Sequence, residues 1–187
     1  MEYDSTLEEK LSEPQGVIPV SETRILVGIG ANLPSARFGA PRDTVEAALA
    51  AMTHAGIAVA SRSRWFESAP VPPSDQPWYV NGVARVESGL APRDLLDRLH
   101  AIEAAFGRVR AEPNAARVLD LDLLAYGDCI LAEPGGLQLP HPRLAQRAFV
   151  LLPLADVAAD WRHPATGQGV EAMLANLPPG QTVRPLA

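Results

Sequence analysis

Two aspartates separated by one residue, Asp120 and Asp122, are the clearest chemical signal in the sequence and lie in the run LDLDLL. Side chains at positions i and i+2 of a β-strand point to the same face, so the two carboxylates are expected to lie side by side. Such a pair repels unless a proton or a cation intervenes, and Mg2+ is commonly bound by carboxylates together with substrate phosphate oxygens and water. The pair therefore favours a magnesium site. The alternative is a half-exposed strand whose leucines pack inward and whose aspartates face water.

Arginines precede this pair along the chain. Arg108, Arg110 and Arg117 lie in the segment that leads into it, and Glu103 lies on the helical segment before them. The chain has no P-loop, since no Gly-rich turn is followed by lysine, and apart from Lys10 every Lys or Arg residue is arginine. Arginine forks suit phosphate oxygens, and phosphoryl transfer depends mainly on positioning and charge neutralisation. The combination favours polyphosphate chemistry; the alternative is a solvated arginine-rich loop beside a surface glutamate.

A second group of residues is suited to a heterocycle. The segment Ala69–Pro77 carries four prolines, which predicts a stiff loop, and Trp78, Tyr79 and Asn81 follow it. Aromatic rings stack on flat ligands, and the asparagine amide both donates and accepts hydrogen bonds at a ring edge. Tyr79 and Asn81 share strand parity, so they can face one pocket. The alternative is an aromatic residue of the core beside an asparagine that satisfies the main chain.

A third segment, Leu139–Phe149, carries His141 between two prolines, followed by Arg147. The sequence offers too few suitably spaced ligands for a zinc site that includes this histidine, so a hydrogen bond within a loop is the simpler role. Gly28 and Gly30 lack the third glycine of a dinucleotide-binding fingerprint, which excludes NAD binding from further consideration.

The elements that must position these residues follow the order β-α-β-β-α-β. Apolar periodicity, prolines and glycines predict strands and helices at these positions: strand Arg24–Ile29, a helix capped by Asp43 and closed by Gly56, strands Ile57–Glu67 and Trp78–Glu87, helix Pro92–Phe106, and strand Val118–Tyr126. This order predicts a ferredoxin-like α+β core, an antiparallel sheet with helices on one face. The remaining third of the chain has a turn-rich part, Gly127–Pro142, and an apolar segment, Arg147–Ala159, and is expected to add helices or a strand around the sheet as a C-terminal extension.

Length and composition favour one globular domain. The chain has 187 residues and a formal net charge of −6, which argues against non-specific nucleic-acid binding. Residues 1–22 predict a flexible tail, and residues 23–187 predict the domain itself. The lone Cys129 excludes an intramolecular disulfide and favours a reducing cytoplasm. No run approaches the roughly 20 apolar residues of a membrane helix, so we expect no membrane association.

Five sequence motifs occur along the chain in this order: GIGANL, SDQPWYVN, IEAAFGRVR, RVLDLDLL and LPHPRLAQRAF. Because of these motifs, the chain resembles the 6-hydroxymethyl-7,8-dihydropterin pyrophosphokinase family of folate biosynthesis. The resemblance extends from about Arg24 to Pro164. It implies an enzyme that transfers the β,γ-diphosphate of ATP to the hydroxymethyl group of a reduced pterin and releases AMP. The implied partners are these small-molecule substrates, with no nucleic acid and no membrane, and we expect a monomer.

The resemblance also implies roles for individual residues. Asp120 and Asp122 match the pair that bridges two Mg2+ ions on the ATP phosphates, and Arg108 and Arg117 match catalytic arginines beside it. Residues implied on the ATP side are Glu103, Arg110, His141 and Arg147. Residues implied in the pterin pocket are Ser68, Val71, Tyr79, Asn81 and Phe149.

Two other functions stay open from the sequence. A degenerate relative would bind pterin or nucleotide without turnover, and the intact aspartates and arginines argue against it. A two-metal nucleotidyltransferase on a similar sheet would release pyrophosphate instead of AMP. The loop from Arg108 to Arg117 contains small residues and a proline, so we expect it to be mobile until ATP binds.

Overall fold

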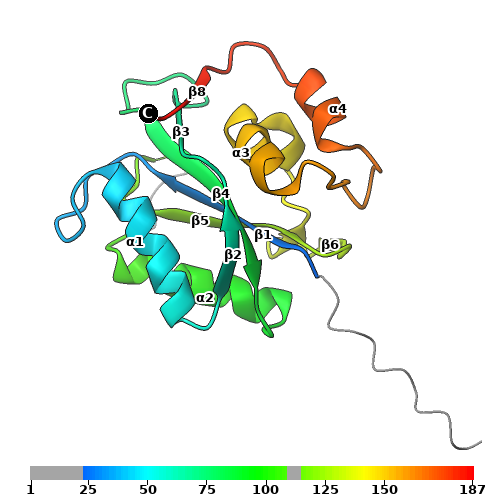
Figure 1. Cartoon of the computed structure of the whole chain (residues 1–187), viewed down its shortest axis with the longest axis horizontal. Coiled ribbons are helices and arrows are strands. Elements are labelled where there is room, and N and C mark those ends of the chain that lie inside the picture. The colour runs from blue at the N-terminus through cyan, green and yellow to red at the C-terminus, as the bar shows by residue number, and fades with distance from the viewer. Residues whose placement is uncertain (1–22, 109–114) are drawn as a thin grey trace, which may run out of the picture.

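A computed structural model describes residues 23–108 and 115–187. The expected flexible tail, residues 1–22, lies outside this part, as do residues 109–114, which include Arg110 and most of the loop expected to be mobile. The described chain contains a six-stranded antiparallel sheet with helices on both faces (Figure 1). This architecture confirms the predicted ferredoxin-like α+β fold.

The strands of the sheet run in the order β5-β1-β4-β3-β8, and β2 also pairs with β4. Their bounds are β1 (Ile25–Ala31), β2 (Ala58–Arg62), β3 (Phe66–Ser68), β4 (Tyr79–Glu87), β5 (Asp120–Tyr126) and β8 (Val183–Pro185). The central strands β1 and β4 pair with each other, and β1 pairs with β5 on its other side. A separate two-stranded pair, β6 (Leu131–Ala132) and β7 (Gln138–Leu139), follows β5 in the sequence.

The second predicted strand, Ile57–Glu67, is two short strands, β2 and β3, so this prediction is wrong in detail. The interruption lies at Ser63, which makes two hydrogen bonds to Val83 of β4. The Ser63 N–H donates to the Val83 carbonyl at 2.9 Å, and the Val83 N–H donates to the Ser63 hydroxyl at 3.0 Å. Because β2 and β3 both still pair with β4, the break redirects the chain within the sheet.

Two helices, α1 (Pro41–His54) and α2 (Pro92–Ala105), cover one face of the sheet (Figure 1). Each begins with a proline, which is tolerated there because the first helical N–H has no partner inside the helix. Each is followed by a glycine with positive φ, 80° at Gly56 and 88° at Gly107, which ends the helix. The sequence predicts Asp43 as the cap of α1, but the helix begins before it, and Asp43 lies in the first turn.

The helices α3 (Ala148–Ala158) and α4 (Val170–Ala175) cover the opposite face (Figure 1). Strand alternation divides the core between the two faces: Val27 packs with residues of α1 and α2, whereas its neighbour Leu26 packs with residues of α3 and α4. The core unit thus has its two helices on one face as predicted. The C-terminal extension supplies α3 and α4 on the other face and β8 at the sheet edge.

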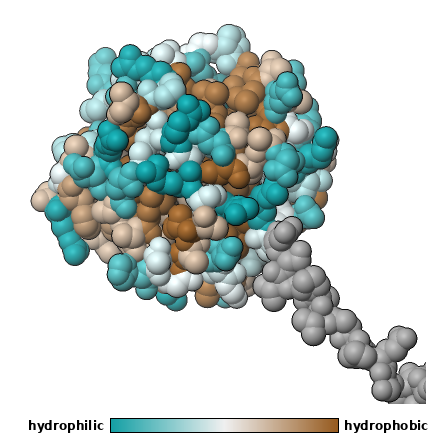
Figure 2. All heavy atoms as spheres, viewed as in Figure 1, coloured by the Kyte–Doolittle hydropathy of each residue, from teal (hydrophilic) through white to brown (hydrophobic). Residues whose placement is uncertain are grey.

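Hydrophilic side chains are interspersed with hydrophobic ones over the visible face of the molecule (Figure 2). The large apolar side chains exposed in the described residues, Val71, Trp78 and Ile130, are not sequence neighbours. In the described part of the chain, no helix combines the length and the apolar character that a membrane crossing requires.

Trp65 connects α1 with the sheet. Its indole Nε1 donates a hydrogen bond to Glu46 Oε1 of α1 at 2.7 Å. The Trp65 ring lies against Gly82 of β4 so closely that a Cβ at residue 82 would be 2.5 Å from a ring carbon. The absence of a side chain at Gly82 is therefore a condition for this packing.

Gly82→Ala is expected to lower the free energy of unfolding by about 1–3 kcal/mol, because the Trp65 ring must move to admit the methyl group. Gly28→Ala in the neighbouring strand β1 is the matched control, since its Cβ would meet the Leu124 side chain at an ordinary 3.4 Å. Urea denaturation of both variants and the wild type measures the difference. Equal stability of the two variants would contradict this account of the packing.

Candidate active site

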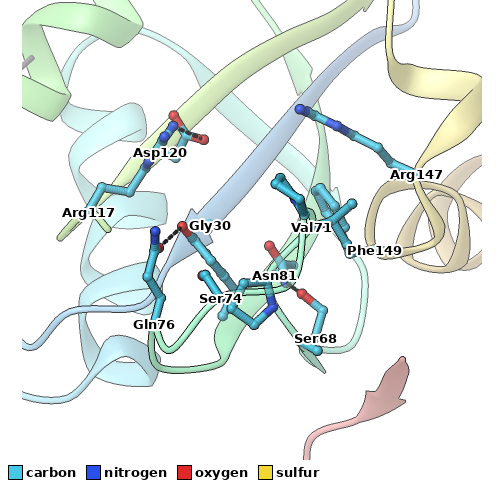
Figure 3. A pocket seen from close by; sticks show the side chains of 14 residues that line it. Gly30, Ser68, Val71, Ser74, Gln76, Asn81, Arg117, Asp120, Arg147 and Phe149 are labelled. Atoms are coloured by element: carbon cyan, nitrogen blue, oxygen red, sulfur yellow. Dashed lines mark hydrogen bonds and ion pairs between the residues drawn. The ribbon is translucent and has the colours of Figure 1, made fainter. Parts of the chain in front are cut away.

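A cavity of about 270 Å3 lies on the α3 side of the sheet (Figure 3). Its lining comes from β1, β3, β4, β5, the segment before β5, the proline-rich loop and the start of α3. It consists of Gly30, Ser68, Ala69, Pro70, Val71, Pro72, Ser74, Gln76, Tyr79, Asn81, Arg117, Asp120, Arg147 and Phe149. Every residue that the resemblance assigns to the pterin pocket is in this set. The structure therefore brings these residues together with Asp120, Arg117 and Arg147, which the resemblance assigns to the ATP phosphates.

Asn81 lies between Gly30 and Ser68 in the cavity wall. Its Nδ2 donates a hydrogen bond to the Ser68 hydroxyl at 2.8 Å, and both residues are buried. A Cβ at residue 30 would lie 3.2 Å from Asn81 Oδ1, so the glycine leaves room beside the amide oxygen. Tyr79 lies on the same face of β4, and its hydroxyl donates to Gln76 Oε1 at 3.1 Å. The hydrogen bond to Ser68 thus holds the carboxamide of Asn81 in one orientation.

Asn32, which the sequence reasoning did not assign, joins the two halves of the site. Its Nδ2 donates to the Pro77 carbonyl at 3.1 Å and to Gln76 at 3.3 Å, while its Oδ1 accepts from the Arg117 N–H at 2.8 Å. It is 1% exposed. Asn32 thus fixes the proline-rich loop relative to the segment that carries Arg117.

Asp120 and Asp122 lie on the same face of β5, as their spacing predicts, and both line a small cavity that adjoins the larger one. Asp120 accepts from Arg108 at 2.5 Å and from Arg117 at 2.9 Å. Asp122 Oδ2 lies 4.0 Å from Arg147 Nη1. Burial, followed by the charge of Asp120, raises the pKa of Asp122 to about 6. The charge of Asp120 therefore acts on Asp122.

Glu103 lies outside the lining of both cavities, on α2 behind β5. Its side chain is 1% exposed, and Oε1 accepts a hydrogen bond from the Leu121 N–H at 2.7 Å. The same oxygen accepts from Arg108. Leu121 is the residue between the two aspartates, so Glu103 holds both the strand that carries them and the arginine that pairs with Asp120.

His141 also lies outside the cavity lining. Its Nδ1 accepts a hydrogen bond from the Arg143 N–H at 3.1 Å, which assigns the ring proton of the neutral form to Nε2. Burial and the positive charges of Arg147 and Arg143 lower the pKa of His141 to about 4. The ring is therefore neutral near pH 7.

Within residues 23–108 and 115–187, no group of three or more His, Cys, Asp or Glu side chains could hold a metal ion by itself. Asp120 and Asp122 supply two carboxylates next to a cavity. Two protein ligands are enough for Mg2+, since the ion retains water molecules and takes phosphate oxygens as its other ligands. The donor set fits Mg2+ bound together with a phosphate substrate, and not a site formed by protein ligands alone.

Several lining residues were missed by the sequence reasoning, including Gly30, Ser74 and Gln76. The phrases that contain them, GIGANL and SDQPWYVN, were noticed as family signals. A local signal existed for Gly30: a glycine inside an apolar strand often marks a site where another group approaches the backbone closely. The polar residues of the proline-rich loop had no such signal.

The chain matches the family model described as 7,8-dihydro-6-hydroxymethylpterin-pyrophosphokinase (HPPK) over residues 26–159. Two relatives carry the name 2-amino-4-hydroxy-6-hydroxymethyldihydropteridine pyrophosphokinase. The protein of Pseudomonas aeruginosa is 43% identical over 156 residues, which are 83% of this chain and 92% of the relative. The protein of Synechocystis sp. is 42% identical over 146 residues, which are 78% of this chain and 71% of the relative.

Solved structures with a similar fold include the Plasmodium falciparum HPPK-DHPS wild type with STZ-DHP, with a TM-score of 0.65 and 12% identity. The similarity covers 83% of this chain and 43% of that one. An HPPK-DHPS in complex with substrates has a TM-score of 0.62 at 10% identity, over 83% of this chain and 45% of that one. This chain thus spans less than half of either structure, and the likeness concerns the fold alone. The family model and the relatives, by contrast, match most of the sequence, and the chain belongs to the 7,8-dihydro-6-hydroxymethylpterin-pyrophosphokinase family.

Proposed function

We propose that this protein transfers the β,γ-diphosphate of ATP to the hydroxymethyl group of 6-hydroxymethyl-7,8-dihydropterin, giving AMP and the pterin diphosphate for folate biosynthesis. The observation that carries the proposal is a cavity in which an aromatic and amide-lined part adjoins carboxylates and arginines. The first part suits a flat heterocycle with polar edges, and the second suits a polyphosphate.

The pterin would occupy the part of the cavity between Tyr79 and Phe149, with Ser68 and Val71 at its side. Because Asn81 Nδ2 is engaged by Ser68, the amide presents Oδ1 as its acceptor for a ring N–H. A buried acceptor of this kind discriminates, since a ligand without the matching N–H leaves it unpaired.

The phosphates of ATP would lie between the arginines that surround the aspartate pair. Arg117 and Arg147 line the cavity from opposite sides (Figure 3). Arg108 lies outside the lining and donates a hydrogen bond to Asp120. In the reaction the pterin hydroxyl oxygen bonds to the β-phosphorus and its proton is released to solvent, the bond from that phosphorus to the oxygen bridging to the α-phosphate breaks, and AMP leaves with that oxygen. The arginines stabilise the charge that moves onto the phosphate oxygens, which is the main demand of phosphoryl transfer.

Asp120 and Asp122 would hold two Mg2+ ions together with ATP. When bound, such ions neutralise phosphate charge and orient the phosphate chain. Asp120 also pairs with Arg117, an arginine that lines the cavity, and with Arg108.

Glu103 and His141 would act on the ATP side without lining the cavity. Glu103 orients Arg108 through its buried carboxylate. His141, neutral and with its proton on Nε2, can donate one hydrogen bond to a phosphate oxygen without adding charge. The role proposed for Arg110 rests on the resemblance alone, since that residue lies outside the described part of the chain.

We further propose that the enzyme works as a monomer in the cytoplasm, where a lone cysteine such as Cys129 stays reduced. The alternative of a degenerate binding protein has no observation in its favour, because Asp120 and Asp122 are both present beside the cavity and Asp120 pairs with Arg108 and Arg117.

Asp122→Asn is expected to lower turnover by roughly a hundredfold, about 3 kcal/mol of transition-state stabilisation, because it removes a metal-binding charge at nearly constant volume. Asp128→Asn is the control, since Asp128 is an exposed carboxylate just beyond the far end of β5. AMP formation measured over a range of Mg2+ concentrations distinguishes the variants. Near-normal turnover of the Asp122 variant at every Mg2+ concentration would refute the metal assignment.

Asn81→Ala is expected to weaken pterin binding by about 1–3 kcal/mol, because it leaves polar groups of the ring unpaired in a buried site. ATP binding should change little. Calorimetric titrations with each ligand alone provide the measurement. Asn176→Ala is the control, because it removes an asparagine hydrogen bond of 2.7 Å at the C-terminal end of α4, away from the cavity lining. A loss of ATP affinity in the Asn81 variant would place this residue in the other half of the site.

A further inference from the structure

The carboxamide of Gln181 holds the main chain on both sides of Arg147. Its Oε1 accepts a hydrogen bond from the Ala148 N–H at 2.9 Å, and its Nε2 donates to the Gln146 carbonyl at 2.9 Å. These groups belong to the two peptide units that flank the Cα of Arg147. A single side chain therefore fixes the main chain from which Arg147 extends toward the cavity (Figure 3).

This contact lies at the start of α3, where the short 3-10 helix η1 (Leu144–Gln146) ends. Arg147 occupies the N-cap position of α3, and no side-chain hydrogen bond caps the helix locally. The first N–H groups of a helix have no partner within it. Gln181 supplies an acceptor to the first of them from 33 residues away in sequence. The orientation of Arg147 thus depends on a distant segment instead of a local cap.

Gln181 is itself tied to the opposite wall of the cavity. The carbonyl of the next residue, Thr182, accepts from the Ala69 N–H at 3.1 Å. In the pairing of β8 with β3, Val183 lies opposite Ser68. Ser68 and Ala69 both line the cavity. Residues 181–183 therefore connect the wall that carries Ser68 with the wall that carries Arg147 and Phe149.

We propose that Gln181 is a positioning residue, which sets the direction of Arg147 relative to Asp122 and the bound phosphates. The inference rests on the proposed function, since it takes Arg147 to act on a phosphate. Arg147 Nη1 lies 4.0 Å from Asp122 Oδ2, and its guanidinium lies 5.3 Å from the ring centre of Phe149. A small rotation of the main chain at Arg147 changes both distances. A displacement of about 1 Å of a group that acts on the substrate can lower the reaction rate by about a hundredfold.

Family membership does not assign this role. The family model matches residues 26–159, and Gln181 lies beyond them. Gln181 is only half-buried, and its side chain makes its hydrogen bonds to main-chain groups, including the Pro178 carbonyl at 3.3 Å. Its replacement should therefore change the placement of Arg147 more than the stability of the fold.

The test compares Gln181→Met, which keeps the length of the side chain but removes both hydrogen bonds to the flanks of Arg147, with the wild type in a steady-state assay of AMP formation. The variant is expected to lower kcat by about five- to thirtyfold, the equivalent of one or two hydrogen bonds. In an Arg147→Ala background the same replacement should lower kcat by less than about twofold, because the group that it positions is gone. A purely structural role would lower kcat by the same factor in both backgrounds, and that result would overturn the proposal.

Two further measurements complete the test. Arg184→Ala, which removes an exposed ion pair of 2.8 Å between β8 and Glu67 of β3, should retain kcat within about twofold. Amide hydrogen exchange should show faster exchange at Ala148 in Gln181→Met, and slower exchange again in Gln181→Glu, which keeps an acceptor for that N–H. A wild-type kcat in Gln181→Met, with the Ala148 amide deprotected, would overturn the inference and leave the proposed function intact. Absence of AMP formation by the wild type would overturn the proposed function itself.

Discussion

Repulsion between two carboxylates on one face of β5 is the constraint on which the arrangement of the site depends. Asp120 and Asp122 point the same way from neighbouring positions, and the structure offsets their charge with arginines. Arg108 and Arg117 pair with Asp120, and Arg108 is held in turn by the buried Glu103. A buried carboxylate is destabilising unless it is paired and hydrogen-bonded, and Glu103 meets both conditions through Arg108 and the main chain of β5. The helix α2 is thereby coupled to the strand that carries the aspartates.

One face of β5 packs into the core, and the other face lines the cavities. Leu121 and Leu123 pack into the core under α1 and α2, while Asp120 and Asp122 line the cavities on the other face. The adjacent strand β1 contributes Gly30 to this second face, where a larger side chain would meet the neighbouring polar groups. Charged groups can therefore lie one peptide away from a dry core because alternation along the strand separates them from it.

The predictions that held were those that depend on local periodicity. Alternation placed Asp120 with Asp122, and Tyr79 with Asn81, and glycines marked the C-terminal ends of both core helices. The misses involve partners that are far apart in sequence. Asn32 bonds to Arg117 across 85 residues, and the break at Ser63 follows from its hydrogen bonds to β4. No local pattern encodes such contacts, since they exist only after the sheet has formed. For the same reason, the sequence did not predict the hydrogen bond from the Leu121 N–H of β5 to Glu103 of α2.

The pairing of β8 with β3 has a consequence for the order in which the protein is built on the ribosome. Its side-chain contact between Arg184 and Glu67 joins residues 117 positions apart, and closing so long a loop is slow compared with local pairing. All other strands of the sheet precede β8 in the sequence. During synthesis one edge of β3 therefore stays unpaired until β8 has been made. Strands with an unpaired edge readily associate with other chains. Docking of β8 ends that exposure, and in the same step the cavity-lining residue Ala69 gains its hydrogen bond to the Thr182 carbonyl.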